Sequence, residues 1–362
     1  MRRGLTSVGA VLFVLSCLRP SEERVERDLA VGRADAAGLS VRVDAGLAVV
    51  RELSDSQLVL WGSAPGFTLR LGSDAARELD IEIQNCLPEA ELTLSGDNGG
   101  QLEALAAGES PTRKRFHLRA PAGELKLALA APDQESDQSF EFALMSDVQE
   151  AIGDVHDIYE LMNEQPNVRF LLGAGDLTNG GTVEELERFQ QELLLLRYPY
   201  FTTLGNHELG VSPDPYHDYF GRGNFQFRFH GVYFTLLDSA GATLDPTVYD
   251  WLDEWLGAAR NDVSVVAMHI PPTDPWGVRN GSWASRSEAG KFLTRIAEER
   301  VDLTLYGHVH SYYSFENAGI EAHISGGGGA NPERFDNMGR HFMVFDIDAK
   351  RGVLSREVVR VD

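Results

Sequence analysis

The spacing of apolar residues along the chain predicts two different parts. From Leu39 to about Ala131, apolar and polar residues alternate in short runs such as Phe67–Leu71 and Leu79–Ile83. Period-two alternation places the apolar side chains on one face of a strand. Glycine- and proline-rich turns separate these runs. Short strands with frequent turns predict a small all-β sandwich domain over residues 38–133.

A polar run over residues 133–139 contains no apolar residue and marks the boundary between the two parts. Beyond it, apolar runs such as Phe140–Met145 and Val168–Leu172 alternate with segments of helical spacing such as Val183–Leu196. Strands that alternate with helices predict an α/β domain over residues 138–362, with ligands at the carboxyl ends of the strands. The run from Phe225 to Leu237 predicts a hairpin that adds antiparallel strands to a second sheet.

The first residues predict a targeting segment. Arg2 and Arg3 precede an apolar run, Val8–Leu15, that is too short to span a bilayer. Residues 1–17 resemble a bacterial lipoprotein signal, in which Cys17 becomes the lipidated first residue; an ordinary cleaved signal or a retained anchor are alternatives. Residues 18–37 are charged and small, and predict a flexible tether. We therefore expect an exported protein that a lipid anchor holds in the bacterial cell envelope, or else a secreted or periplasmic protein.

The net charge limits the partners of this protein. The 362 residues carry a formal net charge of −23. Nucleic acid is not expected as a partner, because its phosphate backbone is held by basic surfaces. A small phosphorylated substrate remains compatible with this charge, since bound metal ions supply positive charge locally.

Five apolar runs are each followed by residues that could bind a metal. Oxygen and nitrogen donors occur together, which suits Mn, Fe or Zn better than Ca²⁺. Each residue is weak evidence alone, because a single aspartate after a strand more often caps a helix. Two ions about 3.5–4 Å apart can activate water and bind the oxygens of a phosphoryl group. The pattern therefore predicts a two-metal hydrolytic centre built from Asp147, Asp176, Asn206, His269, His308 and His310.

The order of these motifs resembles that of the calcineurin-like metallophosphoesterases, over about residues 140–350. The resemblance implies a four-layer α/β/β/α core, here preceded by a β-sandwich as in purple acid phosphatases. It implies that Asp176 bridges two metal ions. Asp147, Gln149 and His310 would complete the first site, and Asn206, His269 and His308 the second. The tyrosine that purple acid phosphatases place three residues after the bridging aspartate is missing, so no purple colour is expected.

The resemblance also implies roles for residues that do not bind metal. His207 would lie beside the metals and stabilise the transition state or protonate the leaving oxygen. Glu208 would orient His207. Gln149 stands where the family commonly has histidine and predicts a weaker first site. Asn179 stands where many members have aspartate and should affect loop geometry. His323 is a candidate for the substrate pocket.

We expect a metal-dependent hydrolase that cleaves a phosphate monoester with metal-bound hydroxide as the nucleophile. One alternative is a phosphodiesterase acting on nucleotides or lipid head groups. The other is a non-catalytic cell-surface binding module that retains its metal site. Metal-dependent turnover of a nitrophenyl ester would separate the enzymes from the binding module.

Overall fold

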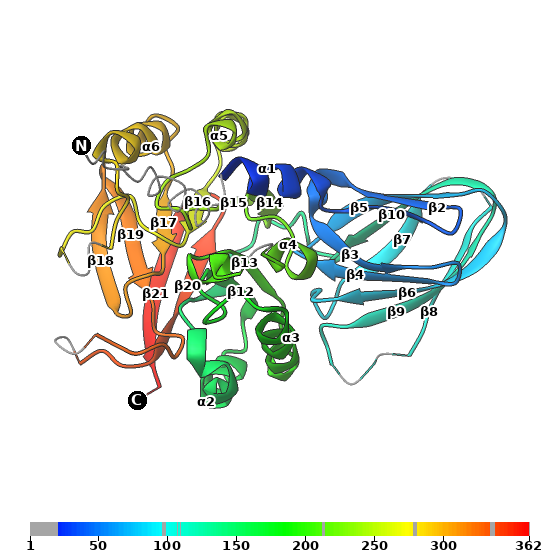
Figure 1. Ribbon diagram of the computed structural model, residues 1–362, viewed down its shortest axis with the longest axis horizontal. Helices are drawn as coiled ribbons and strands as arrows, with labels where there is room; N and C mark the ends of the chain where they lie inside the picture. Colours follow the sequence, from blue (N-terminus) through cyan, green and yellow to red (C-terminus); the bar gives the residue numbers. More distant parts are fainter. Residues whose placement is uncertain are drawn as a thin grey trace, which may run out of the picture.

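The chain folds into two parts that lie next to each other (Figure 1). The structure, a computed structural model, describes residues 21–361 except 96–98, 107, 109, 212–213, 278–280 and 334–336. The predicted signal segment with Cys17 lies outside the described residues. Within the described part of the chain, no helix combines the length and the apolar character needed to cross a bilayer.

The N-terminal part consists of two five-stranded sheets. Their inner faces pack together in one buried cluster that includes Leu69, Ile81 and Leu127. Burial alternates along the strands, as the apolar pattern predicted. One sheet has the order β1 (Arg33–Ala36), β2 (Leu39–Val43), β5 (Phe67–Ser73), β10 (Gly123–Ala130), β7 (Glu91–Ser95). The other has the order β3 (Ala48–Leu53), β4 (Gln57–Gly62), β6 (Arg77–Gln84), β9 (Lys114–Ala120), β8 (Gln101–Ala104).

The C-terminal part contains two further sheets, which pack face to face through aromatic side chains. Phe142 and Phe170 of one sheet contact Phe234 of the other at ring-centroid distances of 5.3 and 5.4 Å. The first sheet has the order β13 (Tyr200–Thr203), β12 (Val168–Ala174), β11 (Phe140–Met145), β20 (His341–Asp348), β21 (Gly352–Arg360). The second has the order β14 (Phe225–Phe229), β15 (Val232–Leu237), β16 (Ser264–Met268), β17 (Leu303–Tyr306), β19 (Ile320–Ser325), β18 (Tyr312–Asn317).

Helices cover the outer faces of both sheets. Helices α2 (His156–Asn163) and α3 (Val183–Glu192) share a buried cluster with β11 and β12. Helices α5 (Pro246–Ala259) and α6 (Arg286–Glu298) share another with β15, β16 and β17. The expected four-layer α/β/β/α architecture is therefore confirmed. The shorter helices are α4 (Tyr216–Tyr219), η1 (Asp44–Gly46), η2 (Gln149–Asp154), η3 (Leu193–Leu195) and η4 (His207–Leu209).

The flexible tether predicted over residues 18–37 is wrong where the structure describes it. Residues Ser21–Ala30 form helix α1, and β1 pairs with β2 directly after it. Arg24 of α1 is 3% exposed, and its Nε lies 2.5 Å from Oδ2 of Asp238 in the C-terminal part. Asp28 is fully buried and accepts hydrogen bonds from the backbone N–H groups of Gly223 and Asn224. The charges of this segment hold it in place because they meet partners far along the sequence.

A buried histidine completes this contact of α1. Nε2 of His217 lies 3.2 Å from Asp28, and its Nδ1 lies 3.4 Å from Asp214. Burial alone would lower the pKa of His217, but the Asp214 and Asp28 carboxylates outweigh it and raise the pKa to about 9. His217 is therefore a cation at neutral pH, and it offsets part of the charge of two buried carboxylates.

This histidine predicts a loss of stability in mild alkali. The pKa of His217 is about 9 in the folded protein, against about 6.5 in an unfolded chain. Its contribution to the free energy of unfolding, about 3 kcal/mol, is complete below pH about 6.5 and is lost as the pH rises through about 9. We expect the melting temperature of the wild type to fall over this window, and to fall less steeply in His217→Gln, where the raised pKa of His269 remains.

The exposed His156, which pairs with Glu192, provides the matched control. His156→Gln should keep the pH dependence of the wild type. Melting curves recorded from pH 6 to pH 10 test both statements. An equal slope in His217→Gln would contradict the assignment to His217.

Candidate metal centre

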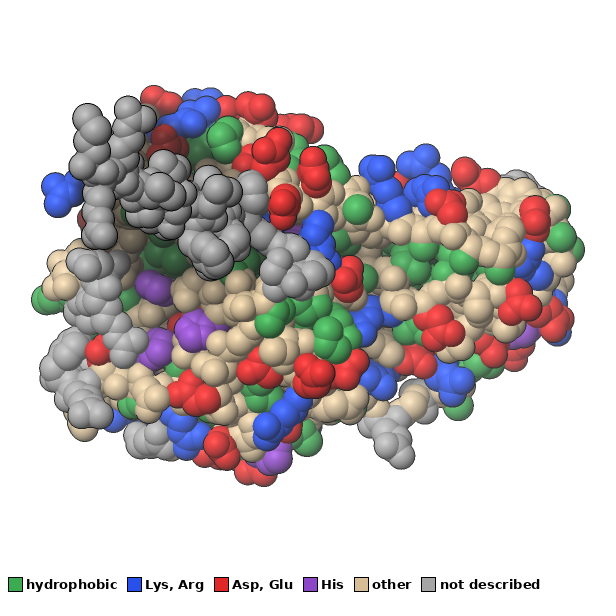
Figure 2. All heavy atoms as spheres, in the orientation of Figure 1, with side chains coloured by type: hydrophobic (Ala, Val, Ile, Leu, Met, Phe, Trp, Pro, Cys, Tyr) green, Lys and Arg blue, Asp and Glu red, His purple; other side chains and the backbone are tan. Residues whose placement is uncertain are grey.

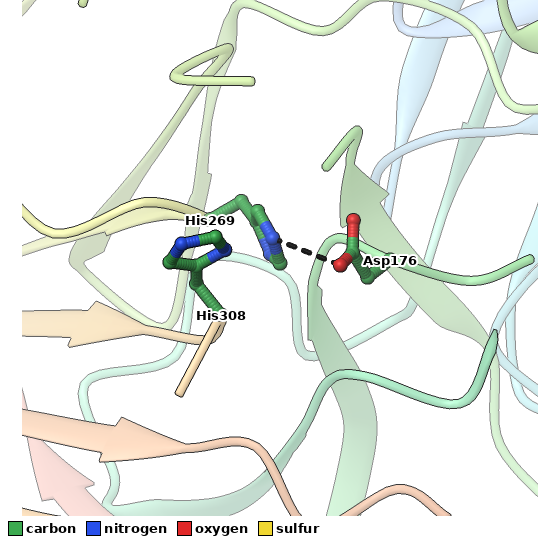
Figure 3. A group of neighbouring side chains, drawn as sticks. All are labelled: Asp176, His269 and His308. Atoms are coloured by element: carbon green, nitrogen blue, oxygen red, sulfur yellow. Dashed lines mark ion pairs between the residues drawn. The ribbon is translucent and has the colours of Figure 1, made fainter. Parts of the chain in front are cut away.

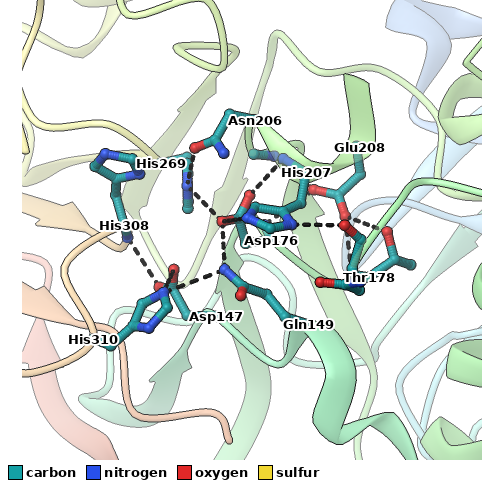
Figure 4. Close-up of polar contacts among 12 residues, drawn as sticks. Asp147, Gln149, Asp176, Thr178, Asn206, His207, Glu208, His269, His308 and His310 are labelled. Atoms are coloured by element: carbon teal, nitrogen blue, oxygen red, sulfur yellow. Dashed lines mark hydrogen bonds and ion pairs between the residues drawn. The ribbon is translucent and has the colours of Figure 1, made fainter. Parts of the chain in front are cut away.

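The predicted ligand residues lie together at one edge of the paired sheets (Figure 4). Asp147 and Asp176 each come two residues after a strand, β11 and β12 respectively. His269 directly follows β16, and His308 comes two residues after β17. Parallel strands have their carboxyl ends at the same edge of a sheet, so residues that are distant in sequence meet there.

The backbone at this edge is held in an unusual conformation. Asp147, Gln149, Asp176 and His308 have φ angles of 63°, 50°, 54° and 71°. Residues with side chains rarely adopt this left-handed region, and the cost is about 1–2 kcal/mol each. Strain of this kind clusters at functional sites, where the surrounding structure compensates for it. Here the loops hold each other, for example through the hydrogen bond from Val148 N to Asp176 O (2.9 Å).

Asp176 is at the middle of the cluster. Its Oδ1 accepts the backbone N–H of His207 at 3.0 Å. Its Oδ2 accepts Nε2 of Gln149 at 2.9 Å and lies 3.2 Å from Nε2 of His269. One donor atom each of Asp176, His269 and His308 lie within 4.8 Å of one another (Figure 3). The carboxylate therefore has possible metal-binding groups on two sides.

Asp176 and His269 change each other's protonation. Burial by itself raises the pKa of Asp176, but the charge and hydrogen bond of His269 outweigh it and hold this pKa below its usual range. Burial likewise lowers the pKa of His269, but Asp176 outweighs it and raises the pKa to about 9. In the protein alone, protonated His269 supplies the positive charge beside Asp176.

Asp147 fits a metal ligand because one of its oxygens has no partner. The side chain is fully buried, and Oδ2 accepts hydrogen bonds from His308 N (2.9 Å) and from the Ser146 hydroxyl. Oδ1 is buried without a hydrogen-bond partner among the described residues; Nε2 of His310 is 3.5 Å away. A buried oxygen without a partner is costly, and a cation next to it would remove that cost.

The histidines are oriented by backbone carbonyl groups. Nδ1 of His269 bonds Ala174 O at 2.7 Å, and Nδ1 of His310 bonds Asn331 O at 2.7 Å. Such contacts fix the tautomer and leave Nε2 free for a metal. Nε2 of His310 lies 3.2 Å from Nε2 of Gln149, whose amide nitrogen also contacts Asp176. A half-turn of that amide would present its oxygen, which is the atom that a metal binds.

The second side of Asp176 carries the remaining predicted ligands. Oδ1 of Asn206 lies 3.2 Å from Nε2 of His269. The ring of His308 meets that of His269 edge-on, with 5.1 Å between centroids. The residue before Asn206 is a glycine, Gly205, and a Cβ at that position would collide with Asp176. All seven residues predicted as metal ligands are therefore brought together.

His207 lies beside the cluster and is 31% exposed. Its Nδ1 bonds the backbone oxygen of Asn179 at 2.7 Å, and its Nε2 lies 3.9 Å from Asp176. The expectation that Glu208 orients His207 is wrong, because the Asn179 carbonyl occupies that position. Asn179 thus contributes through its backbone. In Figure 2, histidine side chains are visible in a hollow on this face of the molecule.

Glu208 instead holds two loops together. Its buried carboxylate accepts the backbone N–H groups of Asp176 (3.0 Å), Gly205 (2.8 Å) and Thr178 (3.0 Å), and the Thr178 hydroxyl (2.9 Å). Burial, with the Asp176 charge adding to it, raises the pKa of Glu208 to about 7. The sequence reasoning missed Thr178 and Ser146, whose only signal was a position next to the aspartate motifs.

His323 does not line the site. It is fully buried, and its Nε2 bonds Glu321 at 2.7 Å. Its ring contacts Tyr312 and Phe345, at centroid distances of 6.1 and 5.5 Å. The predicted pocket role is therefore wrong. His323 lies on β19, the strand before the glycine run, but successive side chains of a strand point to opposite faces, and that of His323 points away from the site.

Comparisons with known proteins agree with this geometry. Residues 140–312 match the sequence model of the calcineurin-like phosphoesterases. A 3′,5′-cyclic-nucleotide phosphodiesterase of Nostoc sp. is 29% identical over 161 residues, which are 41% of this chain and 58% of that protein. A UPF0046 protein of Caenorhabditis elegans is 26% identical over 207 residues, 48% of this chain and 67% of that protein. The chain thus spans less than two thirds of the Nostoc relative.

A solved structure extends the similarity to the fold of nearly the whole chain. A purple acid phosphatase from yellow lupin seeds superposes with a TM-score of 0.51 at 12% identity, covering 83% of this chain and 73% of that chain. This likeness concerns the fold. The resemblance that the sequence motifs indicated is confirmed: residues 140–312 match the model of the calcineurin-like phosphoesterases, a family of metal-dependent hydrolases.

Proposed function

We propose that this protein hydrolyses phosphate monoesters at a centre of two metal ions. The observation that carries the proposal is the position of Asp176, with donor groups on both of its sides. Asp147, Gln149 and His310 would hold one ion with Asp176. Asn206, His269 and His308 would hold the other with Asp176. The mixed oxygen and nitrogen donors suit Mn, Fe or Zn.

The two ions, when bound, supply an activated water near neutral pH and neutralise the phosphoryl oxygens. The chain's own contribution to the reaction comes from His207. Its ring is fixed by the Asn179 carbonyl at Nδ1, so Nε2 is the free nitrogen. When protonated, Nε2–H can give its proton to the ester oxygen as the bond to phosphorus breaks. The ring is then left neutral, with its remaining proton on Nδ1 toward Asn179.

A phosphodiester is the second candidate substrate. The relative from Nostoc is named a 3′,5′-cyclic-nucleotide phosphodiesterase, and it aligns with 41% of this chain. A phosphate monoester and a phosphate diester differ in charge and in the number of ester groups on the phosphorus. An assay on matched esters therefore distinguishes them.

The test combines metal analysis with a substrate panel. We expect about two ions per chain by elemental analysis, and metal-dependent turnover of 4-nitrophenyl phosphate that exceeds turnover of bis(4-nitrophenyl) phosphate. Faster cleavage of the diester would favour the second candidate. Full activity with one ion would contradict the dinuclear centre. Two bound ions without turnover of any ester would favour the non-catalytic binding module.

A further inference from the structure

A second polar cavity lies where the two parts of the molecule meet. Its volume is about 500 Å³, and it is bordered by the turn between α1 and β1, by β3, and by α4. None of the residues of the metal centre lines it. In Figure 2, Lys and Arg side chains border the join between the two parts on the face shown. The residues that matter in the cavity are Arg27, Arg33, Arg51, His217 and Asp218.

Two of the arginines at this cavity form no close ion pair with a described residue. Arg27 pairs with Asp218 at 3.0 Å and with Asp214 at 3.3 Å, and His217 lies between Asp28 and Asp214. Arg33 and Arg51 have no carboxylate within 4.0 Å among the described residues. Surface arginines elsewhere, such as Arg42 and Arg70, do pair with carboxylates. Arg51 feels the charges of Glu187 and Asp218 only from a distance, so neither guanidinium group is directly paired.

Arg51 is held with part of its donor set free. Its guanidinium lies 4.0 Å over the ring of Tyr219, and Nη1 donates to Gln190 Oε1 at 3.2 Å. These contacts fix the plane of the group. Among the described residues, Arg51 has hydrogen-bond partners only in Gln190 and Tyr219, and its Nε and Nη2 are not buried, so they can still donate to a ligand in the cavity. Burial lowers the pKa of Arg51, which adds to the cost of leaving it unpaired.

Arg222 is a third arginine near the cavity, although it does not line it. Its Nε is buried without an acceptor among the described residues. Burial lowers the pKa of Arg222; the Asp28 carboxylate acts against this, and the charge of Arg33 lowers the pKa to a smaller extent. Gly46 makes room for the side chain, because a Cβ at that position would collide with Arg222 Nε.

We propose that this cavity binds a phosphate group, and that the site is separate from the metal centre and independent of the proposed function. Guanidinium groups bind tetrahedral oxyanions through forked hydrogen bonds. The two unpaired arginines of the cavity come from different strands, Arg33 from β1 and Arg51 from β3. Their combined charge suits a doubly charged phosphate better than a singly charged carboxylate. The volume admits inorganic phosphate or a small phosphorylated molecule.

Inorganic phosphate and pyrophosphate are the probes. The metal-loaded protein is titrated with each by calorimetry at constant ionic strength, with acetate as the reference anion. We expect Arg33→Gln/Arg51→Gln to bind one phosphate fewer than the wild type, or to bind it at least tenfold more weakly. Turnover of 4-nitrophenyl phosphate should be unchanged in this variant. Tighter binding of pyrophosphate would indicate a ligand with more than one phosphate group.

Two further variants keep the test decisive. Arg113→Gln/Arg115→Gln, at a separate cavity of about 320 Å³, should bind phosphate as the wild type does. The single variant Arg33→Gln removes an exposed side chain that has no ion-pair partner among the described residues. It should therefore fold even if the double variant, which also loses the contact of Arg51 with Tyr219, does not. Equal phosphate binding by the wild type and by the Arg33 variants would overturn the proposal. Acetate binding as tight as phosphate binding would overturn the ligand class.

Discussion

Asp176→Asn is expected to remove bound metal and turnover together, with a loss of activity of more than about 10³-fold. The carboxylate of Asp176 contacts side chains on both sides of the centre, those of Gln149 and His269. Asparagine keeps the size of the side chain and can still accept the N–H of His207. It lacks the negative charge that two neighbouring cations require. The loss should therefore come from metal binding rather than from packing.

Elemental analysis and ester turnover, measured on the same preparation, test this expectation. Asp157→Asn is the matched control, because Asp157 lies on α2 near the same sheet and pairs with Arg340 on the surface. The control should keep both metal and activity. A folded Asp176→Asn protein with a full complement of metal would show that Asp176 does not bridge the ions.

His207→Ala is expected to retain the metals and lose turnover by about 10²–10⁴-fold. The side chain of His207 lies outside the cluster of donor atoms, and its ring is oriented by Asn179. A proton donor matters most when the leaving oxygen is strongly basic. The loss should thus be large for an alkyl phosphate and small for 4-nitrophenyl phosphate, whose leaving group needs no proton.

Single-turnover rates with the two esters measure this difference. His156→Ala, which removes a surface histidine paired with Glu192, should behave as the wild type. Loss of metal in His207→Ala would make His207 a ligand. An equal loss for both esters would assign it to charge stabilisation rather than to proton transfer.

The architecture and the ligand set could be predicted because their signals are local. Each predicted ligand comes within four residues of the end of an apolar run, and parallel strands bring such ends to one edge. The hairpin of β14 and β15 was visible as two apolar runs around His230–Gly231. The sandwich was visible as alternation, because each of its sheets has one buried face.

The remaining features depend on partners that the local sequence does not show. Helix α1 was taken for a tether because its residues are charged, yet Arg24 pairs with Asp238, which lies 214 residues further along the chain. Glu208 was predicted to orient its sequence neighbour His207, whereas its carboxylate accepts hydrogen bonds from the backbone N–H groups of Asp176 and Thr178 in another loop. His323 was predicted to line the pocket, but the sequence does not show to which face of its strand the side chain points, and the side chain is buried.

The left-handed backbone at Asp147, Gln149, Asp176 and His308 has a consequence for how the enzyme matures. An unfolded chain rarely visits these conformations, and the hydrogen bonds that compensate for them exist only after both sheets have paired. We therefore expect metal ions to bind after the strands have paired rather than to direct the folding of these loops. Loading is then a late event, so the compartment in which folding finishes selects the metal that the mature protein carries.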